Sequence, residues 1–289
     1  PSHTVRAGQA IEVIAVRQRA DDAVRGVGCV IESGPAALLH AAEHLALLRK
    51  PAGMHTAALN GGTGASLEFF LPGLLPGHPR ACLLNRLDAP TSGIVVAALD
   101  EKGSDMYHDA QQLGKTEKRY LALLQGALKK PIAARQRIAQ DKRRRVKVLD
   151  KEDADPLRHT HIFPIAVLDA DAVWRVIMPA KSPKAGGREE RACTLAGCLI
   201  CKGARHQIRA HAAFYGFPLA GDVRYGAETL FSDPLPDAGE CFFLHHARFS
   251  MPGIDARDLP RWLDALRSAG IISEKAVADW LERPCKIWG

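Results

Sequence analysis

The chain has 289 residues, of which 47% are hydrophobic and 25% are charged, so a disordered or fibrous protein is excluded. Lys and Arg (39) outnumber Asp and Glu (32) by 7, and this excess predicts a polyanionic partner. No stretch has the roughly 18 uncharged apolar residues of a membrane helix, and the N-terminus lacks the pattern of a signal peptide. A cytoplasmic protein without a membrane partner is therefore expected.

Five ranges in the first part of the chain predict structural elements. Residues 4–16 have the β-branched content of a strand, and residues 35–49 predict a short helix followed by a buried strand. Residues 60–66 contain three glycines and predict a loop. Residues 92–99 predict a central strand, and residues 102–114 a helix that ends at its final glycine.

The positive charge is concentrated in residues 115–147. Twelve Lys and Arg residues face two acidic residues there, a local charge of +10 against +7 for the whole chain. Four of these cations are consecutive and have no apolar partner face: Lys142, Arg143, Arg144 and Arg145. This pattern favours contact with phosphates over a role in solubility alone.

The rest of the chain alternates irregularly between strand and helix patterns. Strands are predicted at residues 117–126, 193–201 and 242–249, and helices at residues 204–215, 260–269 and 274–283. Polar residues 181–191 predict a surface hairpin or loop. Strands and helices without regular alternation favour an α+β fold over a doubly wound sheet.

Four segments collect polar residues that could carry chemistry: residues 85–93, 117–126, 203–226 and 242–249. Considered singly, each segment is more typical of an ordinary turn, a core strand or a solvated helix face. Only the combination of the four segments and their order along the chain point to a particular function.

Together these segments resemble the motifs of the large-subunit (RluA-type) family of RNA pseudouridine synthases. Asn85–Asp88 with Thr91–Gly93 is similar to the family's HRLDxxTSG signature, with Asn85 in place of the first His. The KxYxAxxxG strand motif is matched by Lys118, Tyr120, Ala122 and Gly126. The GRxHQIRxH helix and the GD turn are matched at Gly203–His211, with Ala204 in place of the Arg, and at Gly221–Asp222. The shorter KPxG and LH elements are matched at Lys50–Gly53 and Leu244–His245.

The resemblance implies an α+β catalytic domain over residues 31–289, with a mixed, largely antiparallel central sheet and flanking helices. Residues 1–30 would then be a remnant of an N-terminal S4-like RNA-binding module and a linker. The implied reaction isomerises a uridine in ribosomal or transfer RNA to pseudouridine. It is redox neutral, so neither a cofactor nor a metal is expected, and a monomer is favoured.

The resemblance also implies roles for individual residues. Asp88 would act at ribose C1′, either as a nucleophile or by stabilising positive charge on the sugar, and Arg209 would keep it ionised. Tyr120 would stack on the extruded uracil, with Ile208 on its other side. Arg86 would fill the vacated gap or hold the RNA backbone. Two further residues complete the expected RNA-binding set: Asn85 and Arg205.

Three alternatives remain open at this point. A non-catalytic RNA- or ribosome-binding protein could keep the same fold for its basic surface. A hydrolase could use Asp88 as its nucleophile, although no second acid or base is fixed beside it. A zinc site could use Cys193, Cys198, Cys201 and His206. Strand positions point Cys198 and Cys201 to opposite faces, so buried, reduced thiols are expected instead. The chain has only seven cysteines, which are sparse for its length, so reduced thiols are expected for the others as well, Cys241 included.

Overall fold

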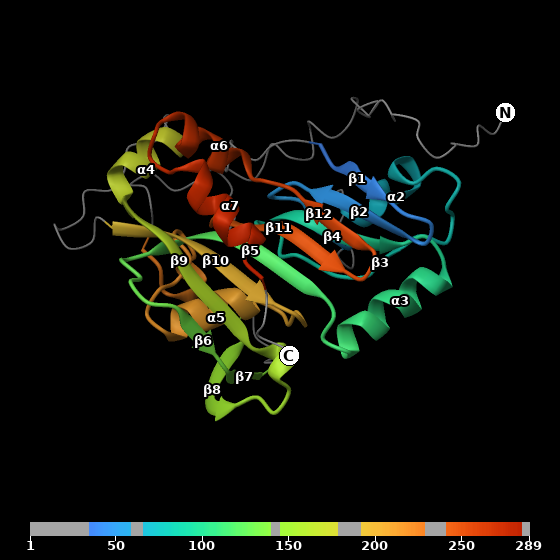
Figure 1. Ribbon diagram of the computed structural model, residues 1–289, viewed down its shortest axis with the longest axis horizontal. Coiled ribbons are helices and arrows are strands. Elements are labelled where there is room, and N and C mark those ends of the chain that lie inside the picture. Colours follow the sequence, from blue (N-terminus) through green and yellow to red (C-terminus); the bar gives the residue numbers. More distant parts are fainter. Residues whose placement is uncertain (1–34, 59–65, 140–144, 179–191, 229–240, 285–289) are drawn as a thin grey trace.

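The computed structural model describes residues 35–58, 66–139, 145–178, 192–228 and 241–284 (Figure 1). Among these residues no helix is long and apolar enough to cross a membrane. The strand expected at residues 4–16, the polar hairpin at 181–191 and the remnant module at 1–30 lie outside the described residues. The loop expected at 60–66 also lies outside them, apart from Ser66.

A ten-stranded mixed sheet forms the centre of the molecule. Its main path runs in the order β1-β2-β4-β11-β5-β10-β9-β6, with β12 paired to β11 and β3 paired to β4. The strands are β1 Ala37–Ala41, β2 Leu45–Lys50, β3 Cys82–Leu83, β4 Ser92–Ala98, β5 Glu117–Gln125, β6 Ile132–Ala134, β9 Thr160–Asp169, β10 Ala192–Ile200, β11 Leu244–Met251 and β12 Ile254–Arg257. The β4–β11 pair is parallel, and the other pairs of this sheet are antiparallel. The expected mixed, largely antiparallel α+β sheet is therefore confirmed.

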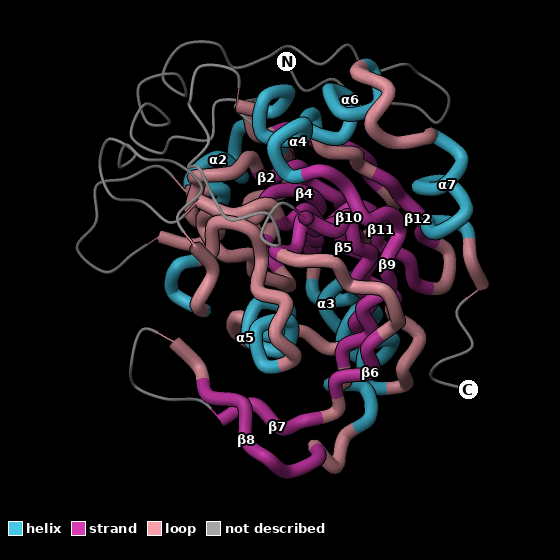
Figure 2. The backbone as a smooth tube through the Cα atoms, turned by 90° about the vertical axis from the view of Figure 1, so that its left-hand side faces the viewer, coloured by secondary structure: helices cyan, strands magenta, loops and turns pink. Residues whose placement is uncertain are grey.

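Helices cover both faces of this sheet, and a second two-stranded sheet lies beside it. The helices are α2 Leu67–Leu74, α3 Glu101–Gln112, α4 Ala170–Ile177, α5 Gln207–Phe214, α6 Arg261–Ser268 and α7 Glu274–Glu282. The second sheet pairs β7 Gln136–Ala139 with β8 Lys147–Glu152. Figures 1 and 2 show α4 and α6 on one side of the central sheet and α5 on the other, with β7 and β8 beyond α5.

The middle strands are buried on both faces, as β5 illustrates. Tyr120 and Ala122 belong to the core cluster that contains Ile208 of α5. Leu121 belongs to the opposite cluster, which contains Trp262 of α6. Because alternate residues of a strand point to opposite faces, both sets must be apolar where both faces are covered. This is why β4 and β5 could be predicted from continuous apolar runs.

One predicted element is wrong. Residues 35–49 were expected to form a short helix followed by a strand, but they form the β1–β2 hairpin. The helix-forming composition of Ala37–Ala41 is outweighed by backbone pairing with β2, which is itself paired on its other edge with β4. The helix expected at 204–215 is present but begins at Gln207.

Candidate active site

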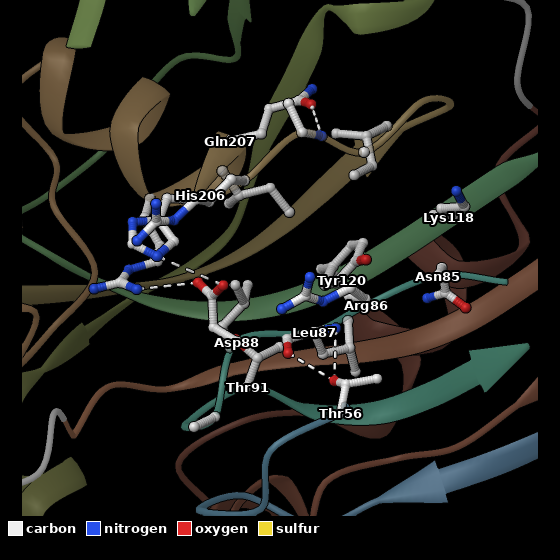
Figure 3. Close-up of a pocket in the computed structure, with 18 of the residues that line it drawn as sticks. Thr56, Asn85, Arg86, Leu87, Asp88, Thr91, Lys118, Tyr120, His206 and Gln207 are labelled. Carbon is white, nitrogen blue, oxygen red and sulfur yellow. Dashed lines mark hydrogen bonds and ion pairs between the residues drawn. The ribbon is translucent and has the colours of Figure 1, made fainter. Parts of the chain in front are cut away.

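A pocket of about 740 Å³ opens on the face of the sheet that α5 covers. It is lined by the loop before β4, by Lys118 and Tyr120 of β5, and by the segment that leads into α5 (Figure 3). Asp88 is the one carboxylate among the described residues that line it. The basic residues of the lining are Arg86, Lys118, Arg205, Arg209 and Arg224. The pocket therefore presents one anionic group within a positively charged wall.

Hydrogen bonds from two buried side chains, Lys50 and Thr56, hold the loop that carries Asp88. The Lys50 ammonium donates hydrogen bonds to three carbonyl oxygens, those of Pro51 at 2.8 Å, Met54 at 2.7 Å and Ala89 at 3.1 Å. The Thr56 hydroxyl donates to the carbonyl of Leu87 at 2.7 Å and accepts from its N–H at 3.0 Å (Figure 3).

Gly93, which follows this loop, allows β4 to lie close against β11. Its φ is +106°, in the region that favours glycine, and a Cβ at this position would collide with the backbone of His246. The position of Asp88 is thus set by buried hydrogen bonds on one side of the loop and by sheet packing on the other.

The Asp88 carboxylate is held by a buried guanidinium. Arg209 Nη1 lies 3.0 Å from Asp88 Oδ2, while its Nε and Nη2 donate to the two oxygens of Asp222 at 2.7 and 2.8 Å. The Arg209 and Asp222 side chains are 1% and 0% exposed, whereas that of Asp88 is 24% exposed. The paired hydrogen bonds to Asp222 fix the plane of the guanidinium, so its remaining edge can hold Asp88 in one orientation.

A second group, His206, approaches Asp88 from the start of α5. Its Nε2 lies 3.7 Å from Asp88 Oδ1 (Figure 3). The Tyr225 hydroxyl accepts from the N–H of Val146 at 3.0 Å and lies 2.9 Å from His206 Nδ1. This contact orients the imidazole ring so that Nε2 faces Asp88.

His206 has both a lowered pKa and an unusual backbone conformation. Burial lowers its pKa to about 4, in spite of the raising effect of the nearby Asp88 charge, so the imidazole is neutral at neutral pH. Its backbone adopts φ +53°, the single non-glycine residue in this conformation within the described part of the chain. Such a conformation persists where the surroundings impose it, as they commonly do at functional sites.

Tyr120 forms part of the pocket floor. Its ring stacks on His246, with centroids 4.5 Å apart and planes inclined by 11°. His246 Nδ1 lies 2.6 Å from the carbonyl oxygen of Ile94, and burial lowers the pKa of this histidine to about 3. Burial raises the pKa of Tyr120, so it remains a phenol. One face of the Tyr120 ring is covered by a neutral imidazole, and the residue contributes to the pocket lining.

Comparison with known proteins explains why these groups are assembled. Residues 44–214, more than half of the chain, match the family described as RNA pseudouridylate synthase. The chain belongs to this family. The enzyme therefore isomerises uridine in RNA, as the resemblance implied.

Individual relatives agree with this membership, and a solved structure shares the fold. Ribosomal large subunit pseudouridine synthase C of Salmonella typhi is 28% identical over 290 residues, covering 93% of this chain and 82% of that protein. Ribosomal large subunit pseudouridine synthase D of Nitrosomonas europaea is 32% identical over 224 residues, covering 76% of this chain and 56% of that protein. The structure of Human RNA Pseudouridylate Synthase Domain Containing 1 has the same fold, with a TM-score of 0.61 at 15% identity over 88% of this chain and 96% of that one.

The pseudouridine synthase pocket brings together most of the residues expected to form its site. Asp88, Tyr120, Arg209, Arg86, Asn85, Ile208 and Arg205 all line it. Arg145 lies outside the lining, with its guanidinium 5.6 Å from the centre of the Tyr225 ring. Lys142, Arg143 and Arg144 lie outside the described residues.

Several residues that shape the site were not expected from the sequence. Asp222 was recognised as part of a turn, yet its carboxylate orients Arg209. Tyr225 and Val146 form the hydrogen-bonded chain to His206, and Thr56 holds the loop before Asp88. Their local sequence carries no signal for these roles, because each role depends on a partner that is distant in the chain.

Cys193 and Cys198, two of the candidate zinc ligands, lie on opposite faces of the sheet. Cys193 and Cys198 are buried free thiols of β10 that belong to opposite core clusters. Burial raises the pKa of each to about 12, so neither is a thiolate at neutral pH. The structure differs from the expectation of reduced thiols at Cys241, which is disulfide-bonded.

We expect the synthase to keep full activity after exhaustive chelation, because protonated thiols are poor metal ligands and the isomerisation needs no Lewis acid. The measurement is pseudouridine formation before and after dialysis against a chelator. Stoichiometric zinc in the purified enzyme, with activity lost on its removal, would contradict this expectation.

Tyr225→Phe is expected to lower kcat about tenfold while RNA affinity is unchanged, the size of one lost hydrogen bond. The change keeps the ring but removes the hydroxyl that bonds to His206 Nδ1 and orients the imidazole toward Asp88. Steady-state kinetics of pseudouridine formation would measure this effect. Tyr215→Phe, which removes a hydroxyl bonded to Gln136 at 3.0 Å, is the matched control. Equal losses in both variants would contradict a specific role for Tyr225.

Proposed function

We propose that this enzyme uses Asp88 to convert a uridine of large-subunit ribosomal RNA to pseudouridine. The observation that carries the proposal is the one carboxylate among the described lining residues, held at 3.0 Å by a buried arginine whose plane is fixed by Asp222. The RNA class is proposed from the relatives, which are named as ribosomal large subunit pseudouridine synthases. Such a substrate would place the enzyme in the cytoplasm.

The reaction exchanges one bond to ribose C1′ for another. The bond from C1′ to N1 breaks, the uracil turns, and C5 bonds to C1′; C5 then loses its proton and N1 gains one. An anion beside C1′ assists this exchange either as a nucleophile or by stabilising positive charge on the sugar. Either role uses the carboxylate anion, and the Arg209 guanidinium holds this carboxylate by a hydrogen bond of 3.0 Å.

The target uridine must leave its stack before this exchange can occur. Unstacking costs a few kcal/mol, which contacts in the pocket have to offset. Tyr120 has one face on His246 and offers its remaining surface to the uracil. Ile208, which is buried and lines the pocket, would pack against the base. Arg86 is exposed at the rim, where it could occupy the gap left in the RNA or hold the backbone.

Pseudouridine mapping tests the proposal directly. We expect a strain that lacks the protein to lose one or a few pseudouridines from large-subunit ribosomal RNA, and the wild-type gene to restore them. Losses confined to transfer RNA would refute the RNA class. Intact modification together with inactivity of the purified protein on ribosomal RNA would favour the non-catalytic RNA-binding alternative, and release of free base or nucleoside would favour the hydrolase.

The basic stretch is expected to contribute to RNA binding. Replacing Lys142, Arg143, Arg144 and Arg145 with Gln should reduce the slope of log affinity against log salt by up to about 3 units, at roughly 0.7 to 0.9 for each phosphate that is no longer neutralised. Filter binding to a large-subunit ribosomal RNA transcript over a salt series would measure the slope. An unchanged slope would show that the RNA follows another path.

A further inference from the structure

The pocket contains a buried cation that the proposed chemistry does not use. Lys118 is 2% exposed and lines the pocket on the same strand as Tyr120. Its ammonium donates one hydrogen bond, to the Tyr107 hydroxyl at 3.0 Å, and no carboxylate of the described chain forms an ion pair with it. A buried charge is costly unless an opposite charge or several hydrogen bonds compensate it. Two of its three donor hydrogens remain for a ligand.

The hydroxyl beside Lys118 is itself poised to donate. Tyr107 Oη accepts from Lys118 Nζ and from Gln111 Nε2 at 3.2 Å. With both of these donors directed at its oxygen, the phenol hydrogen can point to another acceptor. Tyr107 and Gln111 come from α3, and both line the pocket. This end of the pocket therefore offers hydroxyl and ammonium donors side by side.

Asn85 adds a third donor at the same end. Its Oδ1 accepts from the N–H of Val96 at 2.7 Å, which directs the amide nitrogen away from that bond. Within the described chain, the two hydrogens on Nδ2 have no partner. In the view of Figure 3, Asn85 and Lys118 both lie on the opposite side of the pocket from His206, and both line the pocket. The substitution of Asn for the family's usual His at this position therefore supplies an amide donor to the pocket.

Among the residues that the structure describes, the remaining hydrogens of Lys118 and Asn85 have no acceptor and Lys118 has no counter-ion. This arrangement matches an anion rather than a neutral group. The ligand must also lie close to the base, because Lys118 and Tyr120 point to the same face of β5, about 7 Å apart along the strand. We propose that Lys118, Tyr107 and Asn85 form a subsite for a backbone phosphate of the RNA, within one nucleotide of the uridine at Asp88. This inference rests on the proposed function of the pocket.

Two ligands that share the base and differ in phosphate test the subsite without requiring turnover. Uridine and uridine 3′,5′-bisphosphate would be titrated into the full-length protein by calorimetry. We expect the wild type to bind the bisphosphate at least about tenfold more tightly, as for one charge-assisted hydrogen bond to phosphate. Lys118→Met should abolish most of this preference and leave uridine affinity unchanged. Lys115→Met, which removes an exposed charge three residues earlier, should keep the preference.

Two further variants keep the test decisive if Lys118→Met does not fold, which thermal unfolding would reveal. Asn85→Asp retains an oxygen for Val96 but places a negative charge where the amide donates, so it should abolish the preference. Tyr107→Phe keeps the ring and should reduce the preference about threefold, as for one weaker hydrogen bond. If the wild type shows no preference, or if both variants keep it, the subsite is refuted. Equal loss of uridine and bisphosphate binding would assign Lys118 to the base instead.

A salt series on RNA distinguishes a backbone phosphate from a free one. On a large-subunit ribosomal RNA transcript, Lys118→Met should reduce the salt slope by about 0.7 to 0.9, the value for one phosphate contact. An unchanged slope together with lost bisphosphate preference would mean that the subsite takes a free phosphate, which refutes the RNA assignment. None of these binding results depends on pseudouridine formation. Failure of the proposed function would instead appear as an inactive wild-type enzyme.

Discussion

Asp88→Asn enzyme is expected to bind RNA with near wild-type affinity and to form no detectable pseudouridine. The amide preserves the size of the side chain but removes the negative charge and most of the nucleophilicity, and either role at C1′ needs the anion. The loss of one negative charge from a pocket lined by five Arg and Lys residues would, if anything, favour phosphate binding. Pseudouridine formation and RNA binding would be measured on the same preparation.

The stability of this variant should change little. Arg209 keeps both hydrogen bonds to Asp222 when the Asp88 charge is removed, so no buried cation loses its principal partner. The Asp88 side chain is 24% exposed, which leads us to expect a cost of only about 1 kcal/mol in the free energy of unfolding. Asp109→Asn on the exposed side of α3 is the matched control. A folded, RNA-binding Asp88→Asn enzyme with near wild-type turnover would show that Asp88 is not the catalytic residue.

Elements of the fold with a clear local sequence pattern could be predicted, whereas elements that depend on pairing with another part of the chain could not. The strands β4 and β5 follow from apolar runs, because burial on both faces leaves an unmistakable pattern. The β1 strand could not be predicted, since Ala37–Ala41 has the composition of a helix and becomes a strand through pairing with β2. The position of α5 was predicted, but its start was not, because His206 adopts a left-handed conformation that histidine seldom takes.

In the site too, sequence motifs identified the main residues, whereas the orientation and protonation state of their side chains required the structure. Asp88 and Arg209 are 121 residues apart, and only the resemblance of their motifs to one family linked them before the structure brought them to 3.0 Å. The orientation of Arg209 by Asp222 and the neutral state of His206 depend on burial and on three-dimensional contacts, which no local pattern encodes. The Asn85 departure could be read from the sequence, but its meaning required knowing that Oδ1 is occupied by Val96.

Arg209→Lys is expected to give a folded enzyme whose kcat is at least about 100-fold lower, because small misplacements of a reacting group cost rates of this order. The lysine ammonium keeps the positive charge and has three hydrogens, but it has no planar fork, so its bonds to Asp222 would not fix the direction of the hydrogen that faces Asp88. The Asp88 carboxylate would no longer be held in one orientation. KM for RNA should change little, since Arg209 is buried and its contacts are made within the protein.

The measurement is steady-state kinetics on ribosomal RNA, with thermal unfolding to confirm the fold. Arg205→Lys is the matched control, because Arg205 is exposed at the rim of the same pocket.

Asp222→Asn tests the same contact through the other partner of Arg209. It weakens the hydrogen bonds that orient the guanidinium and leaves Asp88 unchanged, so it should also lower kcat. Loss of this buried charge should also cost on the order of 3 kcal/mol of stability, because Arg209 would lose its fully buried counter-ion. If Arg209→Lys turns over at a near wild-type rate, the planar guanidinium is not what positions Asp88, and the His206 imidazole becomes the group that does.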